Sequence, residues 1–387
     1  MTQRAPQPLP DPKRFLFTAI SPQPENTGIY AYNSGHRTKV LAGGTMAAAA
    51  QGYLLAVRDG QLIAYPFDEE RMQIHGDVRL VRFAEQVRSF SVAGNTLAYW
   101  AGPGPQARLM WFDRSGRGLG GLGEPAEGGS LSLSPDGAKA AVVRDSGVWL
   151  LDFARDTTMR LTFGPGTPTA AVWSPDSTRI VFGMQQGSGS GIFVKQVNGA
   201  GNPEMLFRSP NRLTVDSWSR DGRIILFHEE EISGKSAIWE LLLEPERKPM
   251  PILRSDFALK SARLSPDGRW MAYVSNESGR DEIYVQTFPG PNGKWVISAA
   301  GGSDPDWRGD GKEMYFRSSE NTLMSVAMEA GPEVLRPGIP QILFRAPNIQ
   351  SYAASADGKR FLVAITPEDS EPGSIDIVLN WREELER

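Results

Sequence analysis

The sequence has no cysteine among its 387 residues, which excludes disulfide bonds, thiolate metal sites and cysteine nucleophiles. It has only three histidines, His36, His75 and His228, and none is paired at the spacing of a zinc site. No run of about 18 apolar residues is present, the length that a membrane-spanning helix needs. The polar, proline-rich stretch from Met1 to Pro12 does not have the pattern of a signal peptide. We therefore expect a soluble chain.

The composition is that of a globular protein with many turns. Apolar residues make up 40% of the chain and charged residues 22%, which is enough to form a core. The 41 glycines and 29 prolines are spread along the whole length and do not mark one linker. The formal net charge of -4 does not favour nucleic acid or an anionic membrane surface as a partner.

A turn motif recurs along the chain, and its clearest copy is Ser265-Pro266-Asp267-Gly268. Proline, aspartate and glycine in this order favour a tight turn, and the aromatic and β-branched residues that follow favour a strand. Related turns place an aspartate at the same position in five other places: Asp136, Asp176, Asp221, Asp310 and Asp357. From Asp136 onward these aspartates are 40, 45, 46, 43 and 47 residues apart.

Weaker copies upstream keep the same spacing, so the chain reads as nine units of about 43 residues. Each unit has the pattern of four short strands, and a period of about 40–45 residues with four strands is typical of β-propeller blades. We predict an all-β fold, with residues 1–387 forming a single β-propeller domain of four-stranded blades. Nine repeats favour nine blades, or eight if the weak first and last units merge. We expect the ring to close between the N-terminal segment before Pro10 and the last unit.

The repeats resemble the WD40-like propeller repeat of the TolB type, also called PD40, whose mark is a W-S-P-D-G turn before an apolar strand. The best matches are Trp173-Ser174-Pro175-Asp176 and Leu264-Ser265-Pro266-Asp267-Gly268. The resemblance is strongest from Leu131 to Phe316 and covers most of the chain. It implies the fold and says little about function.

A narrower resemblance comes from the segment Tyr53–Leu62, from Pro66-Phe67-Asp68 and from the ending Val378-Leu379-Asn380-Trp381. These segments resemble the C-terminal sensor region of bacterial membrane-anchored serine/threonine kinases. In that family a kinase domain and a transmembrane helix precede the propeller. The resemblance implies sensing or protein contact, and it implies a location outside the cytoplasm. A free-standing chain would be cytoplasmic.

Two motifs suggest chemistry but have simpler explanations. Gly116 to Gly121 satisfies G-x-G-x-x-G, but no helix is expected after it, so we interpret it as a hairpin rather than a phosphate site. The repeated aspartates lie in separate turns, where a carboxylate bonds its own backbone, so we do not expect them to converge on a metal. No nucleophile elbow of the form G-x-S-x-G is present. We predict no cofactor.

Propellers bind their partners where loops reach the innermost strands around the central channel. Asp304 and Asp306, just before Trp307, are the strongest polar candidates there. From the register of the repeats we predict the following ligand-binding residues: Arg88, Arg212, Asp216, Lys260, Arg263, Asp304, Asp306 and Gln350.

We expect a non-enzymatic recognition or sensor module that binds a protein, a peptide or a small polar ligand at the channel face. One alternative is a propeller hydrolase or lyase, which would need two or more carboxylates or histidines within about 6 Å at the channel mouth. Another is a scaffold that contacts a kinase domain of a longer parent protein or a second copy of itself.

Overall fold

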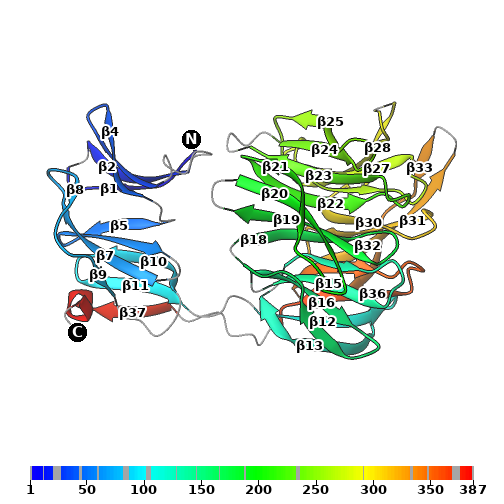
Figure 1. Ribbon diagram of the computed structural model, residues 1–387, viewed down its shortest axis with the longest axis horizontal. Helices are drawn as coiled ribbons and strands as arrows, with labels where there is room; N and C mark the ends of the chain where they lie inside the picture. Colours follow the sequence, from blue (N-terminus) through cyan, green and yellow to red (C-terminus); the bar gives the residue numbers. More distant parts are fainter. Residues whose placement is uncertain are drawn as a thin grey trace. The chain divides into compact units, whose positions relative to one another are not determined.

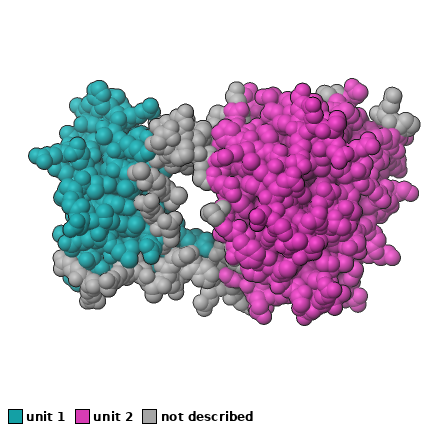
Figure 2. Space-filling view, viewed as in Figure 1, with its two compact units in different colours: residues 1–105, 371–387 teal, residues 106–370 magenta. Residues whose placement is uncertain are grey.

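The computed structural model describes residues 2–11, 13–20, 28–42, 46–58, 61–81, 87–101, 106–127, 129–144, 146–164, 166–186, 189–231, 236–290, 292–331, 334–346, 348–367 and 375–385. These residues form almost only β-strands, which confirms the predicted all-β class (Figure 1). The chain divides into two compact units. Unit 1 comprises residues 1–105 and 371–387, and unit 2 comprises residues 106–370 (Figure 2).

The described residues include one short 3₁₀ helix, η2 (Trp381–Leu385), in unit 1. No helix in the described ranges has both the length and the apolar character that crossing a bilayer requires.

Unit 2 contains six antiparallel sheets, five of which are built from strands consecutive in sequence. The first two are β14 (Leu131–Leu133), β15 (Lys139–Arg144), β16 (Gly147–Asp152) and β17 (Thr157–Arg160), then β18 (Thr167–Trp173), β19 (Arg179–Gln186), β20 (Gly189–Gln196) and β21 (Glu204–Ser209). The next two are β22 (Arg212–Trp218), β23 (Ile224–Glu230), β24 (Ser236–Leu242) and β25 (Lys248–Ser255), then β26 (Leu259–Leu264), β27 (Trp270–Ser275), β28 (Glu282–Thr287) and β29 (Lys294–Val296). The fifth is β30 (Gly302–Trp307), β31 (Glu313–Ser318), β32 (Thr322–Ala330), β33 (Leu335–Pro337) and β34 (Gln341–Arg345).

The sixth sheet joins the two ends of unit 2. Its strand order is β13 (Gly118–Glu127), β12 (Gln106–Asp113), β36 (Arg360–Ile365) and β35 (Ile349–Ala354). The innermost strands β14, β18, β22, β26, β30 and β35 contact one another in cyclic order, and β35 returns to β14. In the described residues unit 2 therefore forms a closed ring of six sheets, each called a blade below.

The recurring turn is built as its residues predict. In the copy at Ser265, the Gly268 amide donates to the Ser265 carbonyl at 2.9 Å, and Gly268 has a φ of 71°, which favours glycine. The Ser265 hydroxyl donates to the Asp267 carboxylate at 2.6 Å, and the Trp270 amide donates to the Ser265 hydroxyl at 3.0 Å. The turn thus fixes the start of strand β27.

The same bonding recurs in the other turns and assigns the aspartates to the backbone of the turn. In the copy at Ser174, Asp176 accepts bonds from Ser174 and from the backbone and side chain of Thr178, which lower the pKa of Asp176 to about 2. Asp136, Asp221 and Asp357 accept equivalent bonds. Among the described residues no three histidine, aspartate or glutamate side chains gather closely enough to hold a metal ion.

The glycine-rich G-x-G-x-x-G stretch forms the hairpin between β12 and β13, as interpreted from the sequence. Gly116 closes this turn with a φ of 81°, and its amide donates to the Asp113 carbonyl at 3.0 Å. Strand β13 then continues as the outer strand of the closing blade.

Unit 1 contains three sheets. The first is β1 (Thr2–Pro8), β2 (Arg14–Ile20), β3 (Gly28–Asn33) and β4 (His36–Ala42). The second is β5 (Ala47–Ala50), β6 (Tyr53–Arg58), β7 (Gln61–Asp68), β8 (Gln73–Ile74) and β9 (Arg79–Leu80). The third is β10 (Val87–Ala93), β11 (Thr96–Ala101) and β37 (Ile375–Leu379).

Strand β37 is anchored in unit 1 by the residue that follows it closely. Trp381 is fully buried and its indole donates to the Gly94 carbonyl at 3.0 Å. This contact holds the end of the last strand against the hairpin between β10 and β11.

The nine sheets of the described residues correspond in number to the nine predicted repeats. The strand pairing of the described residues differs from the predicted closure by the N-terminal segment. Strand β1 pairs with β2 inside unit 1, whereas the last turn repeat pairs with β12 inside unit 2. The reason is that β12 and β13 precede the first strong turn and supply the two outer strands that β35 and β36 lack.

Candidate functional site

The centre of unit 2 encloses a cavity of about 420 Å³ that is lined by residues from all six innermost strands. A volume of this size lies within the range of about 300–1,000 Å³ in which proteins hold small ligands. The wall carries both polar and apolar side chains. This channel is the candidate functional site.

Five of the innermost strands contain irregularities, and in four of them a residue at the irregularity lines the channel. Pairing with the neighbouring strand shifts register in β18, β22, β26, β30 and β35. The residues at the shifts include Thr169, Asp216, Ser261, Asp304 and Gln350. Such bulges redirect a side chain out of the regular ladder and are frequent next to functional sites.

Two of the bulge aspartates are held by a basic side chain from the second strand of the same blade. His228 Nδ1 lies 2.9 Å from both carboxylate oxygens of Asp216. Arg317 donates from Nε and Nη2 to Asp304 Oδ2 at 3.0 and 2.8 Å. Asp216 is only 3% exposed, so its contact with the imidazole offsets part of the free-energy cost of burying the carboxylate.

The Asp216–His228 pair was not anticipated from the sequence, which suggested only that His228 lies in a charged stretch. A signal was nevertheless present. His228 and Arg317 each follow a phenylalanine and stand at the same distance after the turn glycine of their repeat, Gly222 and Gly311. Aligning the second strands of the blades would have placed both side chains toward the innermost strand.

Asp306 and Arg263 occupy the wall from neighbouring blades. Burial raises the pKa of Asp306, and the nearby Arg263 charge opposes this change. The Asp306 carboxylate accepts a bond from the Ala354 amide at 3.2 Å. Burial also raises the pKa of Tyr352 well above its ordinary value, with the charges of Asp306 and Asp304 adding to the effect.

Four of the predicted ligand-binding residues line the channel: Asp216, Arg263, Asp304 and Asp306. The structure places the other four elsewhere. Lys260 pairs with Asp281 at 2.7 Å, and Arg212 and Gln350 are exposed at the starts of β22 and β35. Arg88 belongs to β10 of unit 1, where its guanidinium lies 5.8 Å from the Trp100 ring. Ligand contact by any of the eight stays a prediction.

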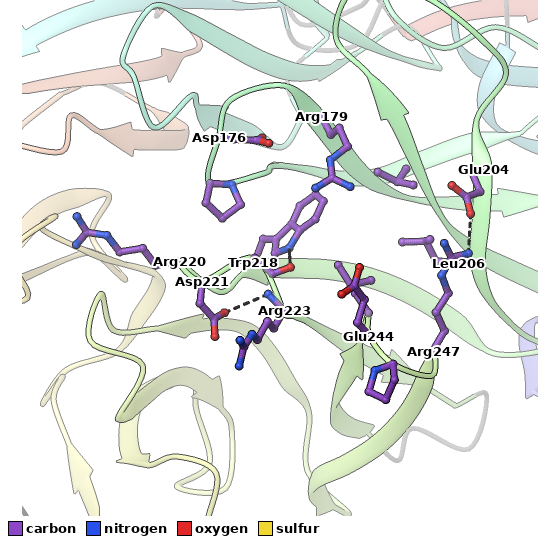
Figure 3. A pocket seen from close by; sticks show the side chains of 15 residues that line it. Asp176, Arg179, Glu204, Leu206, Trp218, Arg220, Asp221, Arg223, Glu244 and Arg247 are labelled. Atoms are coloured by element: carbon purple, nitrogen blue, oxygen red, sulfur yellow. Dashed lines mark hydrogen bonds and ion pairs between the residues drawn. The ribbon is translucent and has the colours of Figure 1, made fainter.

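A second cavity of about 770 Å³ lies beside two of the recurring turns, between the sheets β18–β21 and β22–β25 (Figure 3). Trp218 opens it. Trp173 and Trp307, at the same position of other blades, donate to carbonyls of the preceding blade, those of Ser132 and Arg263. Trp218 instead donates to Gly222 of its own turn at 3.0 Å, and Arg179 lies 5.2 Å from its ring.

The charges of this groove balance. Four arginines line it, Arg179, Arg220, Arg223 and Arg247, beside four acids, Asp176, Glu204, Asp221 and Glu244. The groove therefore selects neither sign of charge, and Glu204 and Arg247 already pair at 2.6 Å. The channel is the better candidate because its charged groups converge from several blades.

Comparison with known proteins supports the fold. No family model and no curated protein matches the sequence. The structure is similar to a TolB-type protein from Agrobacterium tumefaciens, with 18% identity and a TM-score of 0.52, over 67% of this chain and 98% of that chain.

Two further structures match less well. TolB from Acinetobacter baumannii has 14% identity and a TM-score of 0.43, over 83% of this chain and 79% of that chain. An oligogalacturonate lyase in complex with manganese has 11% identity and a TM-score of 0.45, over 78% and 82%. Neither match carries weight here. Together with the repeats and the blades described above, the first match shows that the chain has the fold of a TolB-type β-propeller.

Proposed function

We propose that the chain is a non-enzymatic recognition or sensor module whose unit 2 channel binds a protein segment, a peptide or a small polar ligand. The observation that carries the proposal is the convergence of acidic and basic side chains from the blades β22–β25, β26–β29 and β30–β34 on one cavity. A ring that served packing alone would bury apolar groups there, because buried charges cost free energy.

The geometry of the polar groups suits recognition. The Asp216–His228 and Asp304–Arg317 pairs fix their side chains before any ligand arrives. A site whose groups are already oriented loses little conformational entropy on binding. Mixed charges in a half-buried cavity select a ligand by the pattern of its donors and acceptors rather than by net charge.

A narrowed channel tests this proposal. Val172 lines the cavity from β18, beside the blade of the Asp216–His228 pair, and Val172→Phe adds bulk there while keeping strand propensity. A library of short peptides and small polar compounds would be screened by calorimetry against the full chain. Compounds that bind the wild type should lose affinity for Val172→Phe and keep it for Lys248→Gln, which changes an exposed residue of β25 outside the cavity. Binding that survives in Val172→Phe would place the site elsewhere.

The Asp216–His228 pair favours a second candidate, a hydrolase or lyase. A carboxylate that holds one imidazole nitrogen at 2.9 Å leaves the other nitrogen able to act as a general base. Both residues line the same cavity, and this places a carboxylate and a histidine well within the separation expected for a propeller enzyme.

A panel of chromogenic esters, phosphate monoesters and glycosides tests the enzyme. His228→Gln keeps a polar side chain but removes the base, so it should abolish any turnover that arises in the channel. Turnover that is unchanged in His228→Gln would come from another site or a contaminant, and absence of turnover with the whole panel would favour the binding module.

A further inference from the structure

One level of the channel is formed by six residues at the same position of their blades. Each lies two residues before the first residue of its turn motif, and each lines the cavity: Ser132, Val172, Ser217, Arg263, Asp306 and Ala353. Strand pairing places them at one height, because each lies opposite the equivalent residue of its neighbouring strand. This ring of six side chains is hereafter called the channel ring.

Three consecutive blades contribute the polar part of the channel ring: Ser217 from β22, Arg263 from β26 and Asp306 from β30. Ser217 is 8% exposed, and its hydroxyl has no hydrogen-bond partner among the described residues. Buried hydroxyls are normally bonded, so an unpartnered one beside a cavity remains available to bond a group that enters the cavity.

Arg263 and Asp306 are also incompletely satisfied. In the described part of the chain the Arg263 guanidinium has neither a hydrogen bond nor an ion pair, although its charge acts on Asp306 and Tyr352. Among the described residues, the Asp306 side chain has hydrogen bonds only from the backbone amides of Ala354 and Trp307. A guanidinium and a carboxylate on adjacent strands that do not pair directly leave room for a group between them.

The other half of the channel ring is small and carries no charge. Val172 and Ala353 are apolar, and the Ser132 hydroxyl already donates to the Ala171 carbonyl at 2.9 Å. One side of the channel ring therefore carries the polar groups that can bind a ligand. The other side carries small, uncharged groups that leave room for it.

These features together define the chemistry of the ligand. A guanidinium binds a carboxylate through two parallel hydrogen bonds, and a hydroxyl can donate a third. A carboxylate such as Asp306 binds an ammonium group. An anion alone would be repelled by Asp306, and a cation alone would be repelled by Arg263.

Building on the proposed binding function, we propose that the channel ring binds a free amino acid, with its carboxylate on Arg263 and Ser217 and its ammonium group on Asp306. A peptide terminus offers only one of these two charged groups at its last residue. The ligand side chain would extend toward the space left by Val172 and Ala353.

Calorimetry with the full chain and each of the standard free amino acids tests the proposal. At least one amino acid should bind, and its N-acetyl and its carboxamide derivative should each bind about tenfold more weakly or worse, because each lacks one charge. Arg263→Gln and Asp306→Asn should each weaken binding by a similar factor, and Ser217→Ala by less. Lys248→Gln, which changes an exposed residue of β25 outside the cavity, should bind as the wild type does.

The outcomes separate this proposal from the general one. If no amino acid binds, or if the capped derivatives bind equally well, the amino acid assignment is wrong. If another compound then binds and loses affinity in Val172→Phe, the channel is still the binding site. Should Arg263→Gln unfold, Arg263→Lys keeps the charge but loses the fork, and undiminished binding in Arg263→Lys would also overturn the proposal.

Discussion

The two units of the chain use the same four-stranded repeat with different results. In unit 2, six innermost strands contact one another in a closed cycle. In unit 1, the described contacts join the first sheet to the second and the second to the third. The difference lies in the pairing of β12 with β36, which joins the two ends of unit 2 in one sheet.

The comparison teaches that the repeat alone does not determine closure. A blade can be built with its outer strands from one end of a chain segment and its inner strands from the other end. This pairing covers the strand edges that an open sheet would expose. Closure also creates the channel, so the polar residues on the innermost strands of unit 2 converge. Arg88 stands at the corresponding bulge of β10 in unit 1, and it does not line the channel.

The largest expected effect comes from the core of the closing blade. Phe361 on β36 is fully buried, and its ring lies 5.0 Å from Tyr315 and 5.6 Å from Phe344. Phe361→Ala should lower the free energy of unfolding of unit 2 by about 3–5 kcal/mol. Hydrogen exchange read by mass spectrometry should show the loss of protection in residues 106–367.

Leu97→Ala is the matched change in unit 1, because Leu97 is also fully buried. It should reduce protection in the sheets of unit 1. If either change reduced protection equally in both units, the chain would unfold as one domain, as the sequence first suggested, and the division into two units would have no energetic meaning.

An intermediate effect is expected at the ion network that ties the closing blade to its neighbour. Glu313 accepts hydrogen bonds from Arg114 at 2.7 Å, Arg308 at 2.9 Å and Tyr315 at 2.9 Å. Arg114 also donates to the Gly358 carbonyl at 3.0 Å. Glu313→Gln should cost about 1.5–3 kcal/mol in urea unfolding at neutral pH.

The pH dependence gives this effect a signature. Burial opposes ionisation of Glu313, but hydrogen bonds from Arg114 and Tyr315 outweigh it and lower its pKa from the ordinary 4.5. A lowered pKa means stability that is present above pH 4.5 and lost as the pH falls further. The difference between wild type and Glu313→Gln should therefore shrink in acid. Glu329→Gln, on the exposed side of β32, should have almost no effect at any pH.

The smallest effect, and the one of opposite sign, is expected in the channel. Burial raises the pKa of Asp306 above its ordinary value of 3.8, so its ionisation costs stability as the pH rises beyond that value. Asp306→Asn should make unit 2 more stable by about 0.5–2 kcal/mol at neutral pH, while it weakens ligand binding. Thermal unfolding at several pH values checks this prediction. A destabilised variant would mean that Asp306 helps to hold the ring together and is not kept for a ligand.

The sequence by itself determined the strands, the turns and their period. In most copies of the turn the serine bonds the aspartate, and the amide of the residue after the aspartate bonds the carbonyl of the first residue, so the pattern could be interpreted without knowing the fold. For the same reason the aspartates were correctly assigned to the turns, and the hairpin after Asp113 was expected.

Only the tertiary structure decided which repeats share a ring and which polar residues meet. The pairing of β12 with β36 joins segments far apart in sequence, and no local propensity encodes it, because it depends on which edges can be buried together. The Asp216–His228 pair and the channel ring have the same origin. Each of their residues is ordinary in its own strand, and their chemistry arises from closure, which brings six separate strands to one axis.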